Sequence, residues 1–76
     1  MNLSEEMCAS IRIIRQSKKI TAKQLAEKIG VTESAITAYE RGTRKIPVDR
    51  LIAVCKVLDI KVEDLYQEES VKNVIS

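Results

Sequence analysis

The side chains of this 76-residue chain that could do chemistry are mostly cations, and they are concentrated in its middle. Residues 11–50 hold ten Lys and Arg against four Asp and Glu, a local net charge of +6, whereas residues 1–10 and residues 51–76 each sum to −2. A basic centre between acidic ends predicts one face that meets a polyanion. On charge alone, an ordinary solvated surface of mixed sign fits equally well.

Other kinds of chemistry are poorly represented. The chain has no His, and its two cysteines, Cys8 and Cys55, form no Cys-x-x-Cys pair, so we expect no metal site and no cofactor. Two glycines offer no Gly-rich phosphate loop, and so short a chain can hardly enclose a substrate pocket, so we expect no enzymatic activity. We interpret both cysteines as small buried hydrophobic residues.

The sequence also predicts a cytoplasmic protein without a membrane segment. No apolar run approaches the roughly 18 residues of a membrane span. The first six residues, Met1 to Glu6, lack the basic and apolar regions of a signal peptide. Two isolated cysteines fit a reducing compartment.

Helical periodicity and helix-end signals predict that the elements carrying these charges are short α-helices. The first is expected over residues 5–17. Thr21 and Gln24 form a T-x-x-Q capping box that opens a second helix, and Gly30 suits the left-handed position that ends it. A third helix is expected from about Glu33, where Thr32 precedes it as a cap, to Arg41, where Gly42 follows it.

The rest of the chain predicts a loop, two more helices and a tail. Pro47 makes the segment after the third helix a loop. The fourth helix is expected from an apolar stripe of Leu51, Ile52, Val54, Cys55 and Leu58, and the fifth from Val62, Leu65 and Tyr66. We expect one domain over residues 1–68 and a short tail over residues 69–76, for which a frayed helix, a strand-like dimer arm and no order are all open.

The second and third helices together make a recognisable unit inside the basic stretch. They are short, and only the turn at Gly30 joins them. Ala26 is small enough to let the two helices approach, and Ile36 fills the angle between them. This is the helix-turn-helix arrangement, in which the first helix lies across the DNA backbone and the second enters the major groove with its N-terminal residues leading.

The sequence resembles the lambda-repressor-like helix-turn-helix domains, the XRE family of Cro/repressor-type regulators. The similarity covers about residues 8–67 and runs through Ile11 to Arg15, Ile20 to Val31, Ser34 to Gly42, Pro47, and Leu58 to Leu65. The resemblance implies an all-α, five-helix domain that binds double-stranded DNA.

The resemblance also implies roles for single residues. The residues expected to face the bases are Thr32, Glu33, Ser34, Thr37 and Ala38. Family members often place a phosphate-anchoring Gln at the start of the second helix, where this chain has Ala22, so Lys23 or the backbone N–H groups there are expected to replace it. Arg41, Arg44 and Lys45 are expected to lie along the DNA backbone. Arg15 and Glu40 match a partly buried, structural ion pair.

The function implied is that of a sequence-specific regulator, either a repressor or a small phage-type regulator. One helix offers few contacts, so we expect a homodimer on a palindromic or near-palindromic operator. The expected dimer contact consists of Val62, Tyr66, Val71, Val74 and Ile75. A restriction-modification controller protein, a DNA-binding antitoxin, and a protein-interaction module that keeps the fold are the alternatives left open.

Overall fold

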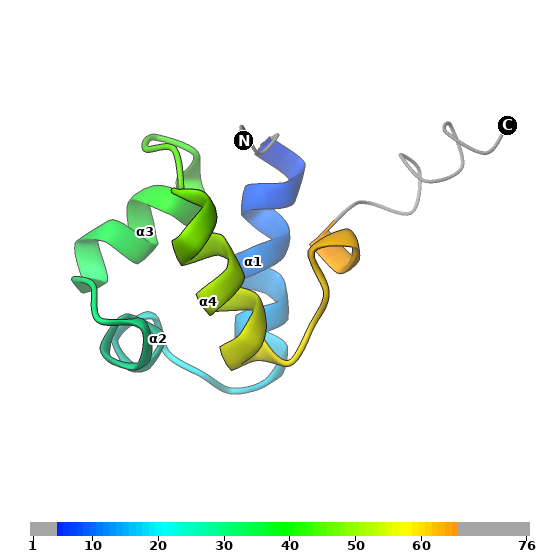
Figure 1. Cartoon of the computed structure of the whole chain (residues 1–76), viewed down its shortest axis with the longest axis horizontal. Coiled ribbons are helices and arrows are strands. Elements are labelled where there is room, and N and C mark those ends of the chain that lie inside the picture. Colours follow the sequence, from blue (N-terminus) through cyan, green and yellow to red (C-terminus); the bar gives the residue numbers. More distant parts are fainter. Residues whose placement is uncertain (1–4, 66–76) are drawn as a thin grey trace, which may run out of the picture.

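The computed structural model describes residues 5–65, and all the regular structure within this range is helical (Figure 1). The elements are α1 Glu5–Ser17, α2 Ala22–Ile29, α3 Glu33–Arg41, α4 Val48–Leu58 and the 3-10 helix η1 Val62–Leu65. The all-α class and the predicted bounds of the first three helices are confirmed. No helix in the described range is both long and apolar enough to cross a membrane.

The predicted count of five α-helices is not confirmed, because η1 is a single 3-10 turn. The backbone N–H of Asp64 donates to the carbonyl of Lys61 at 2.9 Å, and the Asp64 carboxylate accepts from the backbone N–H of Lys61 at 2.8 Å. These two bonds between Lys61 and Asp64 close the turn, and the fully buried Leu65 packs it into the core.

The expected dimer contact falls mainly outside the described residues. Tyr66, Val71, Val74 and Ile75 lie there, as does the predicted boundary between residues 68 and 69. The remaining member, Val62, is partly buried and packs against the core. These predictions therefore stay predictions.

Local capping signals set the helix ends. The Thr21 hydroxyl accepts from the backbone N–H of Gln24 at 3.0 Å, and the Gln24 side chain accepts from the backbone N–H of Thr21 at 2.9 Å, so the capping box is confirmed. Gly30 and Gly42 both have φ of 76°. This is the left-handed conformation that glycine adopts without the steric cost of a Cβ.

The core is formed by one apolar face from each helix and by Leu65 of η1. Its largest fully buried side chains are Ile11, Leu25, Ile36, Leu51, Val54, Leu58 and Leu65. In Figure 1 α4 runs through the middle of the domain, with α3 and α2 to its left and η1 to its right. Ile52, which the sequence placed in the apolar stripe of α4, is 46% exposed, because the buried face follows Leu51, Val54, Cys55 and Leu58 instead.

Candidate nucleic-acid interface

Contacts within the turn fix α3 relative to α2. Leu25 and Ala26 of α2 are buried, as are Ala35 and Ile36 of α3. The carbonyl of Ala26 accepts from the backbone N–H groups of both Gly30 and Val31, the latter at 3.0 Å. The chain therefore leaves α2 and enters α3 within a few residues, and the two helices lie across each other (Figure 1).

The N-terminal turn of α3 presents polar side chains to solvent. Thr32, Glu33 and Ser34 are exposed. Thr32 is the N-cap, and its hydroxyl oxygen accepts from the backbone N–H of Ala35 at 3.1 Å. A hydroxyl has one O–H and two lone pairs, so Thr32 still has its O–H to donate. The exposed end of α3 therefore offers a donor, a carboxylate and a second hydroxyl.

Thr37 and Ala38 continue this face one turn further along α3, and both are half-buried. The Thr37 hydroxyl donates to the backbone carbonyl of Glu33 at 3.1 Å. That bond uses its proton, so Thr37 can only accept from a ligand in this rotamer. Ala38 offers a methyl group.

The four cations that the sequence assigned to a polyanion backbone, Lys23, Arg41, Arg44 and Lys45, are all exposed. None of them forms a hydrogen bond or ion pair through its side chain to another residue in the described part of the chain. Arg44 is held in a different way, since its guanidinium carbon lies 5.8 Å from the centre of the Tyr39 ring. This cation-π contact restrains the loop after α3.

Tyr39 itself is a residue whose surroundings the sequence did not reveal. It is only 2% exposed, and its hydroxyl accepts a hydrogen bond from Nη1 of Arg50 in α4. Tyr39 therefore ties α3 to α4 while its ring supports Arg44.

Arg15 and Glu40 form a two-pronged, buried ion pair between α1 and α3. Arg15 Nε lies 2.7 Å from Glu40 Oε2, and Arg15 Nη2 lies 3.1 Å from Glu40 Oε1. Arg15 Nη1 donates to the carbonyl of Ile20 at 2.8 Å. Two parallel bonds of this kind match the shapes of a guanidinium and a carboxylate. The pair fixes the C-terminal half of α3 against α1.

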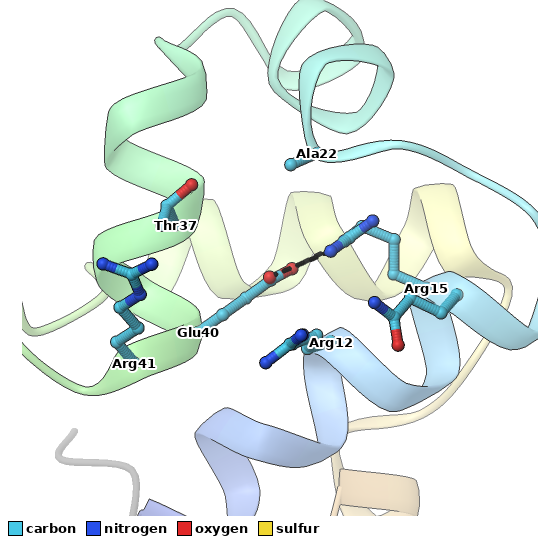
Figure 2. A pocket seen from close by; sticks show the side chains of 7 residues that line it. Arg12, Arg15, Ala22, Thr37, Glu40 and Arg41 are labelled. Carbon is cyan, nitrogen blue, oxygen red and sulfur yellow. Dashed lines mark hydrogen bonds and ion pairs between the residues drawn. The ribbon is translucent and has the colours of Figure 1, made fainter.

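A surface pocket of about 250 Å³, here called the α1–α3 hollow, lies beside this ion pair (Figure 2). Its walls are Arg12, Arg15, Gln16, Ala22, Thr37, Glu40 and Arg41. The hollow brings predicted interface residues, Thr37 and Arg41, next to two residues of α1 that the sequence analysis did not single out, Arg12 and Gln16. Arg12 and Gln16 are four residues apart and share one face of α1, and Arg12 is three residues before Arg15, so this spacing was the available signal.

The fold and the exposed face of α3 define a helix-turn-helix protein, and comparison with known proteins agrees. A helix-turn-helix family model matches residues 11–65. The HTH-type transcriptional regulator YobD of Bacillus subtilis is 38% identical over 56 residues, which are 74% of this chain and 50% of YobD. The chain belongs to the XRE-type helix-turn-helix family.

Two further relatives are matched over most of their own length. Control protein C.SmaI of Serratia marcescens is 29% identical over 73 residues, which are 96% of this chain and 87% of C.SmaI. The crystal structure of the P22 c2 repressor in complex with a synthetic operator has a TM-score of 0.73 and 30% identity, covering 80% of this chain and 92% of that one. The chain spans only about half the length of YobD.

Proposed function

We propose that this chain is a DNA-binding transcriptional regulator that places α3 in the major groove. The observation that carries the proposal is the arrangement of α2 and α3, which exposes the polar N-terminal turn of α3 and flanks it with exposed cations. None of these cations forms a side-chain hydrogen bond or ion pair within residues 5–65. The P22 c2 repressor, which shares the fold at 30% identity, was crystallised with an operator. Its likeness supports the same use of α3 here.

The chemistry of α3 indicates modest direct reading of bases. Glu33 can accept from a cytosine amine, Ser34 and Thr37 can bond base edges or phosphate, and the Ala38 methyl can meet a thymine methyl. None of the proposed base-reading residues is Arg, Gln or Asn, which make two-pronged contacts. Phosphate contacts and DNA shape therefore carry a larger share of the specificity.

The regulator acts as a homodimer in this proposal. A second copy supplies a second α3, and half-sites of the operator then lie about 34 Å apart, one turn of DNA. Repression follows most simply from such binding, because a dimer on an operator excludes other proteins from the same DNA.

Replacing Arg41, Arg44 and Lys45 together by Ala tests the proposal. These side chains are exposed, so the variant should fold, form the same oligomer and lose most of its affinity for duplex DNA. The matched control replaces Lys18, Lys19 and Lys61 by Ala, three exposed cations outside the interface. DNA affinity that is equal in the two variants would instead support a protein-interaction module.

A restriction-modification controller protein is the second candidate function. The likeness to control protein C.SmaI along nearly the whole of both chains favours it. The candidate predicts that the selected DNA site lies beside genes for an endonuclease and a methyltransferase. A site beside unrelated genes favours a general repressor.

A further inference from the structure

One face of α4 is exposed to solvent although it carries large apolar side chains. Val48 and Ile52 are 47% and 46% exposed, and they are two of the three large hydrophobic residues that are exposed within residues 5–65. They are four residues apart, so they lie on the same face of the helix. The opposite face of α4, which packs into the core, consists of Leu51, Val54, Cys55 and Leu58.

Two opposite charges, Asp49 and Lys56, lie on the same exposed face of α4. Both side chains are exposed, and neither forms a hydrogen bond or ion pair within residues 5–65. Seven residues separate them, about 10 Å along the helix axis, so they are too far apart to pair with each other. The helix dipole explains an acid near the first turn and a base near the last. It does not explain the exposed Ile52 between them.

This face of α4 is complementary to itself. Ile52 lies three residues after Asp49 and four before Lys56. If two α4 helices pack antiparallel about a two-fold axis near Ile52, Asp49 of each copy lies opposite Lys56 of the other, and the two Ile52 side chains meet at the axis. A polyanion would be repelled by Asp49 and would gain nothing from Ile52. The order of charges therefore favours a second copy of the same helix as the partner.

We infer that the exposed face of α4 is a self-association surface, on which a second copy of the chain docks its own α4 in antiparallel orientation. The inference goes beyond the proposed function, since it applies to the chain without DNA and none of the proposed DNA contacts lies on α4. The helix has 11 residues and is about 16 Å long. The contact is therefore small, and the association is weak and depends on concentration.

The first test compares Ile52→Glu with Ile13→Glu by sedimentation equilibrium of the full chain without DNA. Ile13 is the matched control, because it is 61% exposed and lies on α1. We expect Ile52→Glu to raise the dissociation constant of the dimer at least about tenfold, since it sets two carboxylates against each other at the axis. Ile13→Glu should leave the constant unchanged. Thermal unfolding of both variants checks that each is folded.

The second test exchanges the charges. Asp49→Lys and Lys56→Asp each set like charges opposite each other in both halves of the contact, so each variant alone should associate more weakly than wild type. In an equimolar mixture, a pair made of one chain of each variant again has opposite charges at every position. We expect the mixture to associate more tightly than either variant alone. A loss of helix stability in the single variants could not produce this recovery.

The outcomes separate this inference from the proposed function. Equal dissociation constants for Ile52→Glu and Ile13→Glu, or a mixture that associates no more tightly than its components, would overturn the inference. Association that is lost in Val74→Glu and kept in Ile52→Glu would assign the contact to the tail instead. A chain that stays monomeric at every concentration but binds a selected duplex would overturn the inference and leave DNA binding intact. A chain that associates through α4 and binds no duplex would contradict the proposed function alone.

Discussion

Glu40 is a buried carboxylate, and the guanidinium of Arg15 compensates its charge. Both residues are buried, and two hydrogen bonds join them. Removing one member of such a pair leaves an uncompensated charge in a region of low dielectric constant. The ion pair therefore acts on function indirectly, by holding α3 at its angle to α1.

Glu40→Gln is expected to lower the free energy of unfolding by about 3 to 5 kcal/mol, because it leaves Arg15 buried without its counter-charge. Urea denaturation measures the change. Glu27→Gln, on the exposed face of α2, should shift stability by no more than about 0.5 kcal/mol. If Glu40→Gln does not fold, Arg15→Met combined with Glu40→Leu should recover the fold. Equal losses in the two Gln variants would contradict a structural role for the pair.

The two cysteines are expected to be unreactive in the folded protein. Burial raises the pKa of the Cys8 thiol, and Glu5 adds to the effect. Burial likewise raises the pKa of Cys55, with a smaller contribution from Asp64. The thiolate is the reactive form, so a thiol reagent near neutral pH should modify the native chain far more slowly than the urea-unfolded chain.

The raised pKa values also make the free energy of unfolding depend on pH. The unfolded chain loses the thiol protons at lower pH than the folded chain, so the cysteine contribution is complete below the ordinary thiol pKa and declines as the pH rises above it. Native cysteines that react as fast as unfolded ones would contradict this account.

At the scale of elements, the turn between α2 and α3 depends on Gly30. Its φ is +76°, and a Cβ added there would meet nothing within 4 Å. The cost of a side chain is therefore backbone strain alone.

Gly30→Ala is expected to destabilise the domain by about 1 kcal/mol. An L-residue in this conformation costs roughly 1 to 2 kcal/mol, and the lower entropy of the unfolded Ala variant offsets part of that cost. Gly30→Asn should cost less, because Asn tolerates the left-handed region. Thermal unfolding measures both. A larger loss for Asn than for Ala would show that space limits the turn.

Elements were predictable from sequence where their signals are local. Thr21 with Gln24, Gly30 and Gly42 act within a few residues, and each end that they predicted is present. The interaction of Tyr39 with Arg50 joins residues on different helices, and no local pattern encodes it. The same holds for the hollow, whose walls come from α1, α2 and α3.

The fifth predicted helix is present as a single 3-10 turn and not as an α-helix. Apolar spacing around Val62 and Leu65 suggested an α-helix, but the Asp64 carboxylate bonds back to Lys61 and the turn is 3-10. Such side-chain bonds to nearby backbone compete with regular helix.

For the molecule as a whole, the base contacts proposed for one α3 are too few for tight, selective binding, so the proposed function requires a dimer. We expect two chains on each selected duplex, which sedimentation of the complex measures directly. One chain per duplex at saturation would contradict the homodimer.

Competition binding on a duplex selected from random DNA tests whether α3 reads a particular DNA sequence. If it does, the selected duplexes share a (pseudo)palindromic sequence, and the complex survives a large excess of unrelated DNA at physiological salt. Selection that converges on no sequence, with binding indifferent to competitor sequence at every salt concentration, would contradict it.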